Sequence, residues 1–246
     1  MEPQKLKFRG VFISATDTSV GKTTLAAGLI GFLRKKGINV GVMKPVASGA
    51  IECDSGKLIS QDAEMLVKFS ESSDPWEWIN PYCLATPVNP ALAAKIEGVT
   101  IDLSRITRCF EEISHKHDFV VVEGAGGLMS PVFENLLVRD MICAMDLPVV
   151  IVSRAALGTI NHTLMTFECL SHRGIETLGF FLNRFPRNPN LSESTNAEII
   201  TSISGVPHLG SVPELGDFFS QHDLIEEFSR SLHRDQFLEI LRDEPA

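Results

Sequence analysis

Short apolar runs alternate along the chain with longer segments in which apolar residues recur at helical spacing. The first run covers residues 8–14, and a helical segment at 22–36 follows it and stops at Gly37. Further strands are expected at 39–43, 119–122, 148–153, 178–183 and 206–212, and further helices at 61–69, 89–97, 103–115, 158–172, 192–204 and 224–241. The proline-rich segment 76–90 is expected to be irregular.

The strand-like runs at 119–122, 148–153 and 178–183 are apolar on both faces. Continuous apolar strands are typical of a parallel sheet that helices cover on both sides. The regular alternation therefore predicts an α/β fold with a doubly wound, mostly parallel sheet. No repeat or linker divides the sequence, so we expect residues 1–246 to form a single domain.

The composition favours a folded protein that binds neither nucleic acid nor membrane. Hydrophobic residues make up 44% of the chain, and 22 Lys+Arg against 31 Asp+Glu give a net charge of −9. Nucleic acid and anionic lipid both need a positive surface. The apolar run 25–33 is too short to cross a bilayer, and residues 1–10 lack the apolar core of a signal peptide. The scattered cysteines predict buried free thiols and a cytoplasmic location (Cys53, Cys83, Cys109, Cys143 and Cys169).

The loop between the first predicted strand and helix ends in Gly21-Lys22-Thr23, the end of a Walker A motif. Backbone N–H groups there can cradle phosphate oxygens, the lysine can reach the β- and γ-phosphates, and the threonine hydroxyl can bind Mg²⁺. Thr16 stands where the first glycine of the motif is usual, so a chance Gly-Lys-Thr is the alternative. The order of strand, loop and helix favours a fold of the P-loop NTPase type.

Glu123 ends the most apolar run of the chain and precedes the small residues 124–127. Ligands in open α/β sheets bind at the carboxyl ends of the strands, so we expect Glu123 to face the phosphate loop and bind a metal. Small residues let the backbone approach a ligand closely. The alternative is a Rossmann fingerprint, in which Met129 stands where the third glycine belongs.

Two more charged residues are candidates for the same site. Lys44 follows the second predicted strand and could hold an anion, and its alternative is a solvated surface lysine. Asp62 lies in the first turn of a helix for which Ser60 is a plausible cap. Its alternative is a simple partner of the helix dipole.

Four blocks, at 16–23, 44–49, 122–127 and 157–162, together resemble the motif set of the dethiobiotin synthetase family and spread over roughly two-thirds of the chain. The Lys-Pro-Val-Ala-Ser-Gly and Glu-Gly-Ala-Gly-Gly blocks are the specific ones, because many ATPases share the phosphate loop. The resemblance implies an ATP-dependent cyclo-ligase of biotin synthesis. Its substrate 7,8-diaminononanoate takes up CO₂ as a carbamate, ATP converts this to a carbamic-phosphoric anhydride, and the second amine closes a cyclic urea.

The resemblance also implies roles for individual residues. Lys44, Lys22 and Thr18 would be catalytic, and Ser48 would contact the substrate. The start of the helix at 158–161 would receive the substrate's tail carboxylate across a homodimer interface, and the alternative there is an ordinary helix start. The implied metal residues are Thr23, Asp62 and Glu123, with Mg²⁺ as the ion and ATP as the co-substrate. The implied substrate residues of the helix start are Gly158, Thr159, Ile160 and Asn161.

The implied nucleotide site extends from the phosphate loop to the last strands. Asn183 resembles the residue that reads adenine, and residues 213–215 would border the base. The full implied set is Ser19, Val20, Gly21, Lys22, Thr23, Thr24, Asp62, Glu123, Gly124, Ala125, Gly126, Asn183, Arg184, Pro213, Glu214 and Leu215.

Three positions depart from the family pattern. Ala15 replaces a usual glycine, and its methyl group would tighten the loop if its φ is positive. Ser19 stands where an acidic residue is frequent, and Arg184 replaces a frequent aspartate after Asn183. The reaction is expected to survive these changes, whereas nucleotide selectivity stays open.

Two other functions remain as alternatives. A partition-type switch ATPase, which binds protein or membrane partners, carries a signature lysine where this chain has Asp17, and the acidic face of the last predicted helix would repel anionic lipid. The amidase-ligase domains of cobyrinate-type synthetases continue into a glutaminase domain, for which 246 residues leave no room. The acidic face comprises Asp223, Glu226, Glu227, Asp235 and Glu239.

Overall fold

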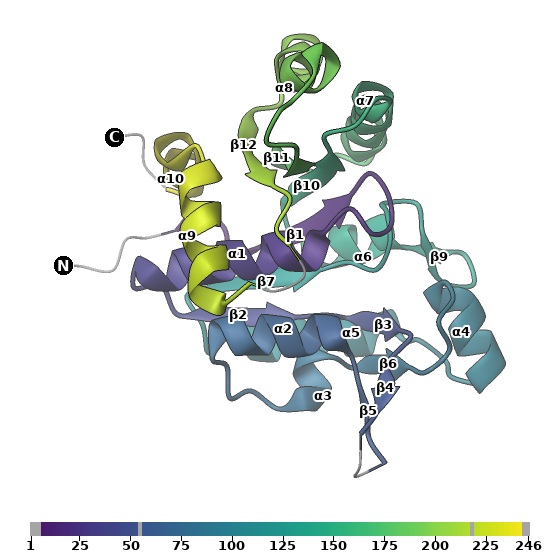
Figure 1. Cartoon of the computed structure of the whole chain (residues 1–246). Helices are drawn as coiled ribbons and strands as arrows, with labels where there is room; N and C mark the ends of the chain where they lie inside the picture. Colours follow the sequence, from purple (N-terminus) through teal and green to yellow (C-terminus); the bar gives the residue numbers. More distant parts are fainter. Residues whose placement is uncertain (1–5, 54–55, 217–218, 243–246) are drawn as a thin grey trace.

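A computed structural model describes residues 6–53, 56–216 and 219–242. Six parallel strands form the central sheet in the order β12-β11-β10-β1-β7-β2 (Figure 1). The strands are β1 (Gly10–Ala15), β2 (Val40–Met43), β7 (Phe119–Glu123), β10 (Val149–Arg154), β11 (Thr177–Phe185) and β12 (His208–Pro213). The predicted α/β fold class is confirmed.

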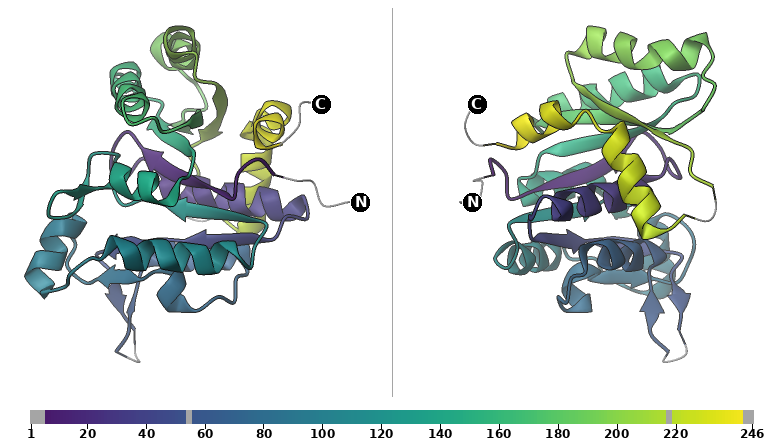
Figure 2. Two further views of the ribbon diagram at one scale, coloured as in Figure 1. Left: turned by 180° about the vertical axis from the view of Figure 1, so that it is seen from behind. Right: turned by 60° about the vertical axis from the view of Figure 1, so that its left-hand side comes forward.

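Helices cover both faces of this sheet, and each face has its own apolar core (Figures 1 and 2). Adjacent residues of β1 show the division, since Val11 and Ile13 face one core and Phe12 the other. On the Val11 face lie α1 (Lys22–Lys35), α2 (Gln61–Ser70), α9 (Gln221–Ser231) and α10 (Arg234–Leu241). On the Phe12 face lie α4 (Pro90–Glu97), α5 (Leu103–Ser114), α6 (Val138–Met145), α7 (Thr159–Ser171) and α8 (Leu191–Ser204).

The helix boundaries follow from local capping chemistry. The hydroxyl of Ser60 accepts a hydrogen bond from the N–H of Ala63, so Ser60 is the predicted cap of α2. The side chain of Asn89 caps α4 in the same way, and Pro90 occupies the first turn, where its missing N–H costs nothing.

The segment expected to be irregular has its own structure. It contains the short helix α3 (Trp76–Ile79) and the strand β6 (Tyr82–Leu84), which pairs in parallel with β3 (Val46–Ser48). The prediction missed both because the segment's prolines mask two short apolar elements. β3, α6 and four further short strands were also not predicted; these strands are β4 (Ile51–Glu52), β5 (Leu58–Ile59), β8 (Pro131–Phe133) and β9 (Leu136–Leu137).

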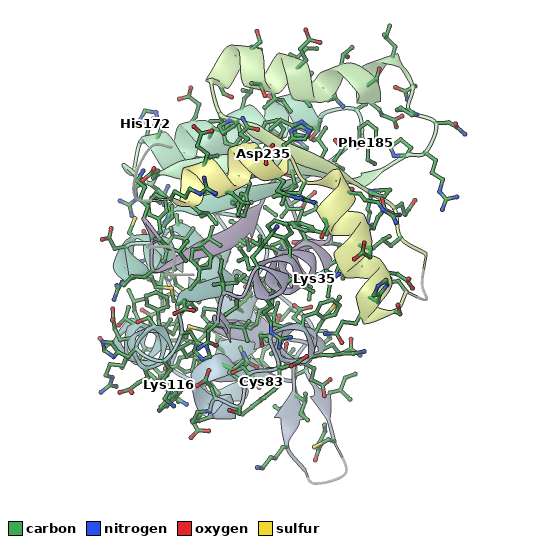
Figure 3. All side chains as sticks on the ribbon, turned by 90° about the vertical axis from the view of Figure 1, so that its left-hand side faces the viewer. Lys35, Cys83, Lys116, His172, Phe185 and Asp235 are labelled. Carbon is green, nitrogen blue, oxygen red and sulfur yellow. The ribbon has the colours of Figure 1, made fainter. Side chains whose placement is uncertain are left out.

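The prediction of one closing helix is wrong, because the chain turns between α9 and α10. Leu232 is extended and forms a bridge with Gly210 of β12. α9 packs on α1, and Lys35 near the end of α1 is labelled in Figure 3. Its ammonium lies 2.5 Å from a carboxylate oxygen of Glu226 in α9. At the end of α10, the carbonyl of Leu241 accepts a hydrogen bond from the N–H of Lys7, so the two described ends of the chain meet.

The structure bears on the predictions about membrane segments and cysteines. No helix among the described residues is both long and apolar enough to cross a membrane. The first five residues of the N-terminal segment lie outside the described part of the chain. Of the five cysteines only Cys109 is buried, and Cys143 is exposed, so the expectation of five buried thiols is wrong.

Candidate functional site

The phosphate loop connects β1 to α1 and has a backbone that glycine makes possible. Gly21 has a φ of +92°, and a Cβ atom built there would lie 2.1 Å from the amide nitrogen of Asn183. Both features exclude larger residues at the start of α1. No side chain caps the N-terminus of α1 by a hydrogen bond, and such a helix start suits a bound phosphate.

Three oxygen-bearing side chains converge at the base of the loop. The hydroxyl of Thr23 lies 2.9 Å from Oδ1 of Asp62 and 2.8 Å from Oε1 of Glu123. Lys44 Nζ lies 2.6 Å from Oδ2 of Asp62 and 2.7 Å from Oε1 of Glu123. Lysine, threonine and two carboxylates thus form one hydrogen-bonded cluster at the carboxyl ends of β2 and β7.

Each member of the cluster is held by a different part of the fold. Glu123 is fixed by β7, which pairs with β1 and β2 on its two sides. The N–H of Lys44 donates to the carbonyl of Ile79, and the amide of Asn80 donates to the carbonyl of Lys44 at 2.6 Å. Asp62 lies in the first turn of α2. The segment predicted to be irregular therefore positions the lysine.

Burial sets the electrostatics of the cluster. Burial alone would lower the pKa of Lys44, but the carboxylates of Glu123 and Asp62 outweigh it and hold this pKa above its usual value. Burial raises the pKa of Glu123, and the neighbouring Asp62 adds to the effect. For Lys22, burial and the charge of Lys44 lower the pKa to about 8. The buried carboxylate of Glu123 and the partly exposed carboxylate of Asp62 share Lys44, so a further cation beside them would be electrostatically favourable.

The donor set at this point fits a hard divalent cation such as Mg²⁺. One hydroxyl and two carboxylates supply only oxygen ligands, which Mg²⁺ prefers. Oε2 of Glu123 is buried without a hydrogen-bond partner, although a buried polar atom normally has one. A metal ion would give this carboxylate the partner that it lacks.

A cleft of about 370 Å³ brings together most of the predicted catalytic and phosphate-binding residues. Lys22, Lys44 and Glu123 line it together, so the arrangement on which the prediction depended is present. The other predicted residues on its wall are Thr18, Ser19, Gly21, Thr23, Thr24, Ser48, Asp62, Ala125, Gly126 and Arg184. Ala47 also lines the cleft and was not predicted.

Comparisons with known proteins show the family of this chain. A family described as an AAA domain matches residues 9–221. The ATP-dependent dethiobiotin synthetase BioD of Bacillus licheniformis is 40% identical over 209 residues, which cover 85% of this chain and 87% of that protein. The same-named proteins of Thermodesulfovibrio yellowstonii and Bacillus subtilis are 39% and 38% identical, over 84% and 85% of this chain and 89% of each relative. The chain belongs to the dethiobiotin synthetase family.

Solved structures support the fold alone. The MinC:MinD cell division protein complex of Aquifex aeolicus aligns with a TM-score of 0.55 at 17% identity, over 89% of this chain and 94% of that one. The septum site-determining protein MinD of Pyrococcus horikoshii, complexed with Mg-ADP, aligns with a TM-score of 0.53 at 18% identity, over 94% of each chain. This dethiobiotin synthetase family member therefore shares its α/β architecture with cell-division ATPases.

The predicted residues at the start of α7 lie outside the cleft. Gly158, with a φ of +94°, precedes the helix and has open space around it. Thr159 is buried, whereas Asn161 is exposed. A second cavity of about 620 Å³ lies on the other side of the phosphate loop and reaches α7. It shares Thr18 with the first cleft, and Met129, His162, Met165, Thr166 and Cys169 also line it.

The prediction missed this second cavity, although the sequence carries a signal for its α7 wall. Residues 162, 165, 166 and 169 recur at i, i+3, i+4 and i+7, the spacing of one helix face. These four residues are of mixed polarity, so a search for apolar helix faces does not detect them.

The residues predicted to surround the base gather at the end of β11. Asn183 is buried, and its amide donates to the carbonyls of Val20 at 2.8 Å and Gly21 at 3.4 Å. Pro213 pairs with Phe185, and the N–H of Glu214 donates to the carbonyl of Phe185. The base-binding roles of this group stay predictions.

Two of the three departures from the family pattern have left-handed backbones. Ser19 has a φ of +57° and Arg184 a φ of +53°. Ala15, by contrast, is the last residue of β1 and does not have a positive φ. Its methyl group therefore causes no backbone strain, and the condition under which it would tighten the loop is not met.

Proposed function

We propose that this protein is an ATP-dependent dethiobiotin synthetase, which converts 7,8-diaminononanoate, CO₂ and ATP into a cyclic urea. The observation that carries the proposal is the single cleft that Lys22, Lys44 and Glu123 line together. Its chemistry is that of a cyclo-ligase. A carbamate forms, is phosphorylated to a carbamic-phosphoric anhydride, and loses phosphate when the second amine attacks.

The two lysines account for the charge problem of this reaction. A carbamate and a terminal phosphate are both anions, so they approach each other only where positive charge lies between them. Lys22 and Lys44 supply two ammonium groups on one wall, and Thr18 borders both cavities. Positioning and charge stabilisation would give most of the rate enhancement.

Thr23, Asp62 and Glu123 would hold Mg²⁺ with their oxygen atoms. When bound, the ion would screen the charge of the β- and γ-phosphates. The partnerless Oε2 of Glu123 and the all-oxygen donor set support this assignment. Lys44 Nζ also donates to the carbonyl of Gly124 at 3.3 Å.

The second cavity suits the diamine, and a homodimer would complete it. Its Met129 and Met165 offer apolar surface for an alkyl chain. Leu157 and Met165 are 89% and 63% exposed, which favours a subunit contact along α7. Gly158 to Asn161 would then present backbone N–H groups to the tail carboxylate of the substrate in the partner subunit.

We further propose a cytoplasmic location.

The adenine base would lie beyond the phosphate loop, at the end of β11. Asn183, Arg184 and residues 213–215 meet there, which supports a shared role in base binding. Val20 and Gly124 would complete the backbone around the phosphates. Arg184 is a donor only, so it would not accept a hydrogen bond from the amino group of adenine.

Phosphate release tests the proposal directly. Purified protein with ATP and Mg²⁺ should release phosphate only when diaminononanoate and bicarbonate are both present, and a dethiobiotin-sized product should appear by mass spectrometry. Omission of bicarbonate is the matched control. Release that depends on a protein partner or on lipid vesicles, and not on the diamine, would favour the partition-type switch ATPase instead.

A further inference from the structure

An ion pair at the first turn of the phosphate loop has no role assigned to it so far, although its acidic member Asp17 also lines the second cavity. Arg154 is the last residue of β10, and its Nη2 donates to Oδ2 of Asp17 at 3.0 Å. The other carboxylate oxygen of Asp17 accepts the N–H of Thr18 at 2.7 Å. The two side chains are 48% and 51% exposed. This carboxylate is thus held by the loop on one side and by a neighbouring strand on the other.

Arg154 and Asn183 together contact both ends of the phosphate loop. In the sheet Arg154 is the register partner of Asn183 on β11. Asn183 donates to the carbonyl of Val20, near the end of the loop, and Arg154 binds Asp17 near its start. Two paired residues at neighbouring strand ends therefore hold the loop at both of its ends.

The position of Asp17 makes this support electrostatic as well as mechanical. The loop would bind a polyanion, yet it carries a carboxylate next to Thr18. The main-chain carbonyl of Asp17 also lies 3.5 Å from Nζ of Lys22. A carboxylate without a partner would repel phosphates and attract the lysine that should bind them.

We propose that Arg154 is a positioning residue for the nucleotide, which neutralises Asp17 and fixes the first turn of the phosphate loop. The inference rests on the proposed use of this loop for ATP. Since the pair is half exposed, it contributes little to folding stability. Its effect is expected in nucleotide affinity, where a repulsive charge would act directly on the ligand.

The test is ATP binding, with Mg²⁺ and without the diamine, by isothermal titration calorimetry. Arg154→Met should raise the dissociation constant about fivefold, whereas Arg154→Lys should stay within about twofold of the parent. Asp17→Asn keeps the acceptor for Thr18 and removes the charge, so Arg154→Met/Asp17→Asn should recover most of the lost affinity. In turnover assays Arg154→Met should raise the KM for ATP and leave kcat within about twofold.

The matched control is Arg9→Met, which removes an arginine of similar exposure from its pair with Glu111 at the amino end of β1. It should bind ATP as the parent does. The inference is overturned if Arg154→Met binds ATP like the parent, or if the double variant is as weak as Arg154→Met. Failure of the synthetase proposal looks different, because the parent would then bind ATP but release no phosphate with diamine and bicarbonate.

Discussion

Two sites with buried or partly buried titratable residues, the cleft and the edge of the sheet at His208, shift the pKa of a basic side chain in opposite directions. In the cleft, Lys44 and Glu123 have side chains that are 4% and 1% exposed, and they lie 2.7 Å apart. At the edge of the sheet, the His208 ring lies 5.2 Å from the ring of Phe180 and 5.0 Å from that of His233. No carboxylate of the described residues forms an ion pair with His208. Burial and the neighbouring His233 lower its pKa to about 4.

The difference shows that burial among neutral or like-charged neighbours disfavours the charged form of His208, whereas two carboxylates retain the charge of buried Lys44. An ammonium next to two carboxylates stays protonated, although desolvation opposes it. A histidine next to an aromatic ring and another histidine stays neutral. The ammonium of Lys44 is therefore available for chemistry, while the ring of His208 is neutral near pH 7.

Removing the ammonium from the cleft should have the largest effect. Lys44→Ala should abolish ring closure, with a loss of about 1000-fold or more, because the carbamate and the phosphate lose the charge between them. The variant should fold, as checked by circular dichroism, with a lower free energy of unfolding because a buried pair is broken. Lys95→Ala, at an exposed lysine of α4, is the control. Turnover of Lys44→Ala near the parental rate would refute its assignment.

Neutralising a carboxylate of the same cluster should have the next largest effect. Glu123→Gln keeps the shape but removes the charge that a metal ion needs, so Mg²⁺-dependent turnover should fall on the order of 100-fold. Asp62→Asn should lose less, since the side chain of Asp62 is 44% exposed and water can replace its ligand atom. An unchanged Mg²⁺ dependence in Glu123→Gln would remove this residue from the proposed metal site.

Acid should destabilise the protein through His208 by a smaller amount. The folded-state pKa of about 4 lies below the unfolded value of 6.5, so the unfolded chain takes up the proton first. The contribution of neutral His208 to the free energy of unfolding is therefore fully present above pH 6.5 and is lost as the pH falls from 6.5 towards 4. Urea unfolding at pH 7 and pH 5 should show a loss in the parent that is about 1 kcal/mol larger than in His208→Phe.

Exposed His172, with a side chain that is 82% exposed, provides the control for this titration (Figure 3). His172→Gln should show the parental pH dependence. If the free energy of unfolding fell equally between pH 7 and pH 5 in the parent and in His208→Phe, a lowered pKa of His208 would be refuted.

The smallest expected effect tests the part that His233 plays. Its charge lowers the pKa of His208 less than burial does. His233→Gln should therefore raise the pKa of His208 by less than one unit, measured by NMR titration of the ring protons. A rise of two units or more would mean that charge repulsion, and not burial, keeps His208 neutral.

The sequence predicted the elements that carry a strong period. The long helices α1, α5 and α7 and the strands β7 and β10 lie within one or two residues of their expected ranges. The alignment of Lys22, Lys44 and Glu123 in one cleft also followed from strand order, because the carboxyl ends of parallel strands share one edge.

The remaining features depend on packing that no local pattern encodes. The turn at Leu232 arises because β12 offers Gly210 as a bridge partner, which a helical period cannot reveal. The Arg154–Asp17 pair joins residues 137 positions apart, and the register of β10 and β1 alone brings them together. Motif similarity assigned neither residue a part in binding. Asp17 lies within the 16–23 block but received no role there, and Arg154 lies outside all four blocks.

The hydroxyl of Thr23 links parts of the chain that are remote in sequence, 39 positions from Asp62 and 100 from Glu123. Such contacts carry a large loop-closure cost, because long segments must be ordered before they meet. A partly folded chain, or an excised fragment, would lack this junction. Occupancy by nucleotide would then favour the fully assembled topology over every incomplete one by mass action, so the substrate would also protect the enzyme from unfolding.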